Sequence, residues 1–294
     1  MTRLPFDVIL FDIDNVLIDT RASYLTAIQK TVETYLRRPG VVSLKDVDEF
    51  KLLGGFNDDW DCSFGIVTFL ETAIQGKPIR FGDHRRQRLA LSELRNLFPE
   101  RPLGIEGLLK NLQTLYERVE TPSYKKIAKI FQGVYWKNPG LVKKEKLIFP
   151  RSFLKKIRDQ GIRLGVVTGR NRLEARYALK RFGILSFFDA VVTIDDVKKE
   201  EKRTGGLRRK PDPWSVLEAA RRIAKGQGTL RYLYVGDLPD DILAATRAKK
   251  AIRIHSAAFP KFARDLEATL SELKKVEPDF LLKNPKDLLK ILSL

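Results

Sequence analysis

Five short apolar runs, each bounded by turn residues, constrain the fold of this 294-residue chain more than any other feature. The runs lie at 6–12, 163–168, 189–194, 231–236 and 251–254. Apolar runs of this length are typical of strands that are buried on both faces of a sheet. Helical patterns separate the later runs, and this alternation predicts an α/β fold with a Rossmann-like, doubly wound parallel sheet. A last short strand and a final helix are expected over 277–282 and 285–292.

The segment from residue 21 to about 145 has a different pattern. It contains no convincing strand, and its apolar residues recur with helical spacing from Tyr24 to Tyr35, Leu89 to Leu97 and Ile127 to Val134. Pro and Gly residues punctuate it at several points. We therefore predict an α/β core formed by 1–20 and 146–294, interrupted by an inserted all-helical cap domain, 21–145.

The composition, 43% hydrophobic and 31% charged, allows one large domain or two of ordinary size. No apolar stretch approaches the ~20 residues that cross a bilayer, so no membrane partner is expected. Asp7, Asp12 and Asp14 interrupt the N-terminal run, which argues against a secretory signal. Cys62 is the only cysteine, so no intrachain disulfide can form. These features favour a cytoplasmic protein.

The formal net charge of +18 indicates affinity for anions, which include phosphorylated metabolites, nucleic acid and anionic lipid. The basic residues are spread along the chain, and Asp or Glu interrupts most of the local clusters. This distribution favours a solvated surface. A nucleic-acid partner is the minor alternative.

Two carboxylates follow the first apolar run, at Asp12 and Asp14. Carboxylates next to a core are costly unless a metal or a reaction uses them. Thr168 ends the second run, and Asp237 and Asp241 follow the fourth. Because ligands bind at the carboxyl ends of parallel strands, these side chains are expected to converge on one edge of the sheet.

Several carboxylates at one point repel one another unless a cation lies among them. Hard oxygen ligands in small number suit Mg²⁺, which we predict as the cofactor. Asp12 and Asp237 are expected to bind the ion directly, with the main-chain carbonyl of Asp14 as a third ligand. Asp241 is expected to act through water.

The same residues suggest phosphoryl-transfer chemistry. Asp12 would attack a phosphoryl group and form an aspartyl-phosphate. Asp14 would protonate the leaving oxygen and later activate water. Thr168 would donate a hydrogen bond to a phosphoryl oxygen. Lys210, in the connection after the third run, would neutralise the phosphoryl charge and hold Asp12.

Four segments in this order resemble the motifs of the haloacid dehalogenase-like hydrolase superfamily: Asp12-Ile-Asp14-Asn-Val, Val166-Val-Thr168-Gly-Arg, Lys210-Pro-Asp-Pro and Gly236-Asp237-Leu-Pro-Asp-Asp241. The insertion resembles the helical cap of the phosphoglycolate-phosphatase and β-phosphoglucomutase branch. The resemblance covers essentially the whole chain and implies a Mg²⁺-dependent phosphatase of a small phosphorylated metabolite. The dehalogenating branch lacks the second aspartate, so Asp14 argues for phosphoryl transfer. Asn15 stands where Gly is common, at a position whose backbone angle Asn tolerates.

Substrate choice in such enzymes is expected to come from the cap. Residues 51–61 contain two glycines followed by polar and aromatic residues, which suggests a loop between cap helices. The candidate substrate-binding residues are Lys51, Asn57, Asp58 and Trp60 in this segment and Gly169 and Arg170 beside Thr168. Arg170 is expected to face the leaving group.

Each of these features also has a purely structural interpretation. Asp12 and Asp14 could form a turn or a helix cap, and Trp60 could belong to the core of the cap. The alternative functions are a phosphomutase of a sugar phosphate and a basic, nucleic-acid-associated protein with weak or no activity. No Gly-rich nucleotide loop of either common type is present, so ATP and NAD are unsupported as cofactors.

Overall fold

The computed structural model describes residues 5–56, 58–75, 104–137, 139–226, 228–263 and 266–294. The chain divides into two compact units. An α/β unit comprises Met1–Asp19 and Lys146–Leu294, and a helical unit comprises Thr20–Glu145.

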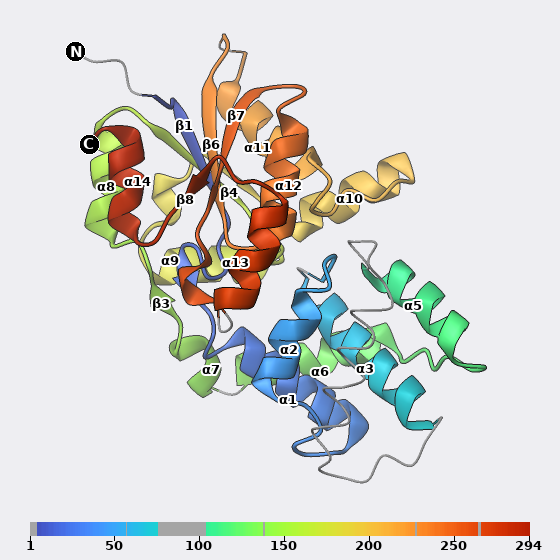
Figure 1. The fold of residues 1–294 in the computed structure, drawn as a ribbon. Coiled ribbons are helices and arrows are strands. Elements are labelled where there is room, and N and C mark those ends of the chain that lie inside the picture. The colour runs from blue at the N-terminus through green and yellow to red at the C-terminus, as the bar shows by residue number, and fades with distance from the viewer. Residues whose placement is uncertain (1–4, 57, 76–103, 138, 227, 264–265) are drawn as a thin grey trace. The chain divides into compact units, whose positions relative to one another are not determined.

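The α/β unit contains a six-stranded sheet in the order β5-β4-β1-β6-β7-β8 (Figure 1). All five neighbouring pairs are parallel. The strands are β1 (Val8–Phe11), β4 (Arg163–Val167), β5 (Ala190–Val192), β6 (Arg231–Gly236), β7 (Arg253–Ala258) and β8 (Phe280–Leu281). Each of the five apolar runs contains or overlaps a strand, and the short strand expected near the C-terminus is β8. The predicted α/β fold with a parallel sheet is confirmed.

Seven α-helices of the α/β unit lie within the described residues. They are α8 (Arg151–Asp159), α9 (Arg172–Arg181), α10 (Ile194–Thr204), α11 (Trp214–Ala224), α12 (Pro239–Ala248), α13 (Leu266–Lys275) and α14 (Pro285–Leu292). Ile9 and Phe11 belong to the same buried cluster as residues of α8, α9 and α14. Val8 and Leu10 belong to another cluster, with residues of α11 and α12. Successive β1 side chains therefore enter opposite cores, which is why this strand is apolar throughout.

Four elements of the α/β unit, β2 (Ile18–Asp19), β3 (Lys146–Leu147), α10 and α13 (Leu266–Lys275), were not predicted. Strands β2 and β3 form a two-stranded antiparallel ladder. Strands of two residues are too short to show a periodic pattern. Helix α10 was also missed, because Ile194 and Val197 are its only buried residues and leave no apolar stripe.

The helical unit packs around α1. Its helices are α1 (Tyr24–Leu36), α2 (Leu44–Lys51), α3 (Asp59–Gln75), α5 (Gly104–Leu115), α6 (Tyr124–Lys137) and α7 (Pro139–Lys143). Ile28 and Val32 of α1 and Phe131 of α6 lie in one buried cluster. Helices α1 and α6 match two of the predicted helical patterns, and the third, 89–97, lies outside the described residues.

Throughout the described ranges, no helix combines the length and the apolar character that crossing a bilayer requires.

Gly165→Val is expected to destabilise the α/β unit. A Cβ at Gly165 in β4 would lie 2.6 Å from Cδ2 of Leu10 and 2.8 Å from Cδ1 of Ile223, and overfilling a packed core costs about 1–3 kcal/mol. Gly206→Val is the matched control, because a Cβ there has no heavy atom within 4 Å. Urea unfolding of both variants measures the difference. Equal midpoints would contradict the packing described here.

Candidate active site

Three adjacent strands deliver polar residues to one edge of the sheet. Asp12 follows β1, Thr168 follows β4 and Asp237 follows β6, and β1 lies between the other two strands. The pairing of β1 with β6 continues to Asp12, whose N–H donates to the carbonyl of Val235 in β6 at 3.0 Å. The parallel ladders thus bring together residues that are more than 200 positions apart.

Lys210 connects these strand ends. Its ammonium contacts Oδ1 of Asp12 at 3.2 Å, Oδ1 of Asp241 at 2.7 Å and the carbonyl oxygen of Val167 at 3.2 Å. All three of its protons therefore have acceptors. Burial by itself would lower the pKa of Lys210, but the charges of Asp12 and Asp241 outweigh it and raise the pKa well above its ordinary value.

Asp241 lies in the first turn of α12 and accepts hydrogen bonds on both oxygens. Oδ2 accepts from the N–H groups of Asp237 and Leu238, at 3.2 and 3.1 Å. Oδ1 accepts from Lys210 and from the hydroxyl of Tyr234 at 3.0 Å. Gly236 is required beside it, since a Cβ there would lie 2.2 Å from Cβ of Asp241. Tyr234 was missed from the sequence, although a hydroxyl inside an apolar run was a visible signal.

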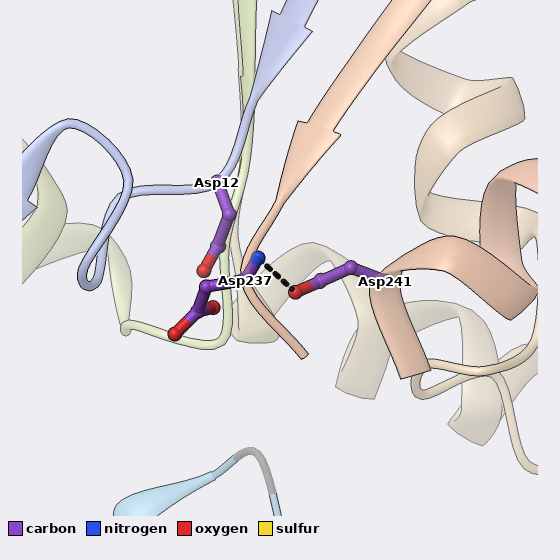
Figure 2. A group of neighbouring side chains, drawn as sticks. All are labelled: Asp12, Asp237 and Asp241. Atoms are coloured by element: carbon purple, nitrogen blue, oxygen red, sulfur yellow. Dashed lines mark hydrogen bonds between the residues drawn. The ribbon is translucent and has the colours of Figure 1, made fainter. Parts of the chain in front are cut away.

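Asp12, Asp237 and Asp241 could hold a metal ion together. Each offers one carboxylate oxygen, and these oxygens lie within 4.8 Å of one another (Figure 2). All three residues are buried. Lys210 contacts two of these three carboxylates, those of Asp12 and Asp241. The donor set is all oxygen, and it fits Mg²⁺.

Burial dominates the electrostatics of Asp12. Burial raises the pKa of Asp12 from 3.8 to about 7; Lys210 acts to lower it, and Asp241 and Asp14 act to raise it further. The ammonium therefore does not compensate fully for the loss of water around this carboxylate.

The side chain of Asp14 lies outside the group of three carboxylates that the described residues form. It pairs instead with Arg170, whose Nη2 and Nε lie 2.7 and 3.0 Å from its Oδ1. Asn15 follows with φ of 56°, in the left-handed region. The unusual backbone angle expected at Asn15 is therefore present, and Asn adopts it more readily than most residues.

The loop after β4 contains Thr168, Gly169 and Arg170. The N–H of Thr168 donates to the carbonyl of Val192 at 3.0 Å, which continues the pairing with β5. Oγ1 of Thr168 accepts the N–H of Arg170 at 3.2 Å. Because that contact uses the oxygen as acceptor, the hydroxyl proton remains available to another group.

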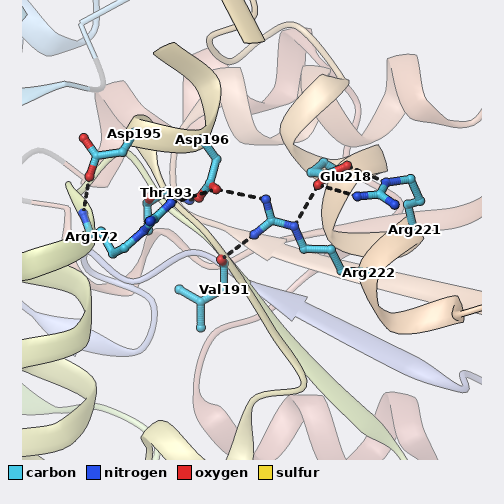
Figure 3. Close-up of polar contacts among 8 residues, drawn as sticks. All are labelled: Arg172, Val191, Thr193, Asp195, Asp196, Glu218, Arg221 and Arg222. Atoms are coloured by element: carbon cyan, nitrogen blue, oxygen red, sulfur yellow. Dashed lines mark hydrogen bonds and ion pairs between the residues drawn. The ribbon is translucent and has the colours of Figure 1, made fainter. Parts of the chain in front are cut away.

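An ion-pair network holds the neighbouring corner between β5 and α10 (Figure 3). Arg222 of α11 donates to Oδ1 of Asp196 at 2.9 Å, to Glu218 at 2.8 Å and to the carbonyl of Val191 at 3.1 Å. Its pKa is raised, since the pairing with Asp196 and Glu218 outweighs burial. This network was not predicted from the sequence; its local signals are the Thr193-to-Asp196 capping box and the i,i+4 spacing of Glu218 and Arg222.

The substrate-binding candidates 51–60 lie in the helical unit. Lys51 ends α2 and its ammonium lies 2.5 Å from Oδ1 of Asp59. Asp58 precedes α3 and accepts the N–H of Trp60 at 2.8 Å, as a helix cap does. Trp60 packs against the buried cluster of this unit. Asn57 lies outside the described residues. Each described candidate thus has a structural contact, and substrate binding by them stays a prediction.

A family model for haloacid dehalogenase-like hydrolases matches residues 6–249. The chain belongs to this family. The predicted resemblance is confirmed, and the chain is an enzyme of the hydrolase class.

Two relatives and one solved structure illustrate the similarity. A pyrophosphatase PpaX from Halalkalibacterium halodurans is 24% identical over 293 residues, which are 99% of this chain and 98% of the relative. PpaX from Bacillus pumilus is 34% identical over 140 residues, 48% of this chain and 56% of the relative. Several other curated relatives likewise match over about half of their own length. A predicted phosphoglycolate phosphatase from Haemophilus somnus has a similar structure, with TM-score 0.60, 18% identity and 97% coverage of each chain.

Asp12→Asn is expected to stabilise the metal-free protein. The pKa of Asp12 is about 7 in the folded protein, against an ordinary value of 3.8. The free energy of unfolding of the wild type therefore falls as the pH rises between these two values. The gain from Asn is therefore expected to be small near pH 4 and on the order of 1–3 kcal/mol at pH 8. Urea unfolding in EDTA at the two pH values measures it, and a gain that does not grow with pH would count against a buried, destabilised carboxylate.

Proposed function

We propose that this chain is a Mg²⁺-dependent phosphohydrolase that transfers the phosphoryl group of a small phosphorylated metabolite to Asp12 and then to water. The observation that carries the proposal is the buried group of Asp12, Asp237 and Asp241 at one edge of the sheet, with Lys210 in contact with Asp12 and Asp241. The family match and relatives named as pyrophosphatases support it.

The bound ion would supply positive charge that lets an anionic phosphoryl group approach a carboxylate. Asp12 and Asp237 would hold it, together with Asp241 directly or through water. Asp241 also acts as an anchor, because its oxygens already accept four hydrogen bonds.

The residues of the chain divide the remaining tasks. An oxygen of Asp12 forms a bond to phosphorus while the bond to the leaving oxygen breaks, and Asp14 gives that oxygen a proton. Asp14 then takes a proton from the water that releases phosphate from Asp12. The Thr168 hydroxyl and the Lys210 ammonium stabilise the phosphoryl oxygens.

The relatives suggest which substrates to try first. Some are named as pyrophosphatases, and a structural neighbour is named as a phosphoglycolate phosphatase. Inorganic pyrophosphate and 2-phosphoglycolate are therefore the leading candidates, with the helical unit as the proposed source of selectivity. We extend the proposal to a cytoplasmic enzyme, because a chain with one cysteine forms no intrachain disulfide.

Asp12→Asn is expected to lower the hydrolysis of 4-nitrophenyl phosphate by about 10⁴-fold or more, because the nucleophile is lost. Asp159→Asn is the control, since this carboxylate is exposed and pairs only with Lys155 among the described residues. EDTA is expected to abolish the activity of both the control and the wild type, and Mg²⁺ to restore it. An Asp12→Asn enzyme with wild-type turnover would rule out the mechanism.

Product analysis separates the phosphatase from the alternatives. Stoichiometric free phosphate is expected, whereas a phosphomutase would return the phosphoryl group to a bound sugar phosphate. The net charge of +18 is the feature that supports a nucleic-acid-associated protein. Salt-sensitive binding to RNA or DNA without phosphate release would favour that function instead.

A further inference from the structure

Arg170 is a buried arginine whose guanidinium reaches Asp14. Its side chain is 1% exposed, whereas that of Asp14 is 26% exposed. Nη2 and Nε lie 2.7 and 3.0 Å from Oδ1 of Asp14, and Nε lies 3.3 Å from Oδ2. The guanidinium therefore makes two hydrogen bonds to Oδ1 of the carboxylate and one longer contact to Oδ2.

The backbone beneath this guanidinium is fixed. The N–H of Arg170 donates to Oγ1 of Thr168, and its carbonyl accepts the N–H of Ile194 at 3.1 Å. The next residue but one, Arg172, donates its N–H to Oδ2 of Asp195 at 2.7 Å. Arg222 in turn ties Asp196 to Val191 across the same corner (Figure 3). A guanidinium on such an anchored loop holds its partner in one place.

The Asp14 side chain has less support of its own. Its turn is closed by the N–H of Asn15, which donates to the carbonyl of Ile18 at 2.7 Å. Among the described residues, Arg170 is the only hydrogen-bond partner of its carboxylate. Arg170, in the loop after β4, therefore orients this carboxylate.

We propose that Arg170 is a positioning residue for proton transfer, holding Oδ1 of Asp14 so that Oδ2 exchanges the proton with the leaving oxygen. The inference rests on the proposed function. As the bond between phosphorus and the leaving oxygen breaks, its electron pair passes to that oxygen, which takes the proton from Oδ2. Asp12 forms the new bond to phosphorus. Oδ1 accepts hydrogen bonds from Arg170 whether or not Oδ2 carries the proton, so the contact persists after the proton is transferred.

Arg170→Met tests this role, because it removes the guanidinium and keeps the hydrogen bond from the backbone N–H of residue 170 to Oγ1 of Thr168. The assay compares kcat/KM for phenyl phosphate, whose leaving oxygen needs a proton, with that for 2,4-dinitrophenyl phosphate, which needs little help. We expect a loss of about 10²-fold for the first and less than about 10-fold for the second. Equal losses for both substrates would overturn the proposal.

A double-mutant cycle separates positioning from direct substrate contact. In an Asp14→Asn background, Arg170→Met is expected to reduce kcat/KM no further, since its effect passes through Asp14. A further loss of tenfold or more would make Arg170 a substrate ligand and overturn the proposal. Should Arg170→Met fail to fold, Arg170→Lys carries the same two comparisons, with a smaller loss of the same leaving-group dependence expected.

Arg231→Met is the matched control. Arg231 makes a comparable two-contact pair with Asp7, at 2.9 and 3.0 Å, beside the opposite end of β1. The Arg231→Met variant is expected to leave the ratio of kcat/KM for phenyl phosphate to that for 2,4-dinitrophenyl phosphate unchanged. A changed ratio would show that the loss of any such ion pair produces the effect and would overturn the proposal. Asp12→Asn is run in parallel: activity in that variant would refute the proposed function, whereas a failure confined to the leaving-group ratio would refute only the role of Arg170.

Discussion

The candidate site depends on the contacts of the Lys210 ammonium. It lies among Asp12 after β1, Asp241 of α12 and the carbonyl of Val167 at the end of β4. Three segments that the sheet brings near one another are thereby joined by one buried charge. A buried lysine is tolerated only where its charge is paired. The two carboxylates therefore serve to keep Lys210 charged as much as Lys210 serves to hold them.

Main-chain hydrogen bonds support this centre on two sides. The N–H groups of Asp237 and Leu238 fix one oxygen of Asp241, and Gly236 leaves the space in which that side chain lies. On the other side, Val192 and Ile194 hold the loop after β4 through backbone hydrogen bonds.

The sheet and the positions of the polar residues could be predicted because both leave local signals. Each strand is a short apolar run, and Asp12, Thr168 and Asp237 directly follow three of them. The pairing of Asp14 with Arg170 could not be predicted, since the two lie 156 residues apart and neither side chain contributes to a periodic pattern. The same holds for the contact of Tyr234 with Asp241 and for the Arg222 network. The β2–β3 ladder was missed because each strand has two residues.

The net charge of +18 and the charge of the site have opposite signs. A net positive charge favours the approach of anions, and salt screens that attraction beyond about 10 Å. The carboxylates of Asp12, Asp237 and Asp241 lie close together, and Lys210 contacts two of them, Asp12 and Asp241. An anion would be repelled from this group unless a divalent cation balanced it. In the proposed reaction, binding of the phosphoryl group would therefore depend on the metal, whereas the net charge favours anions in general and accounts for no particular substrate.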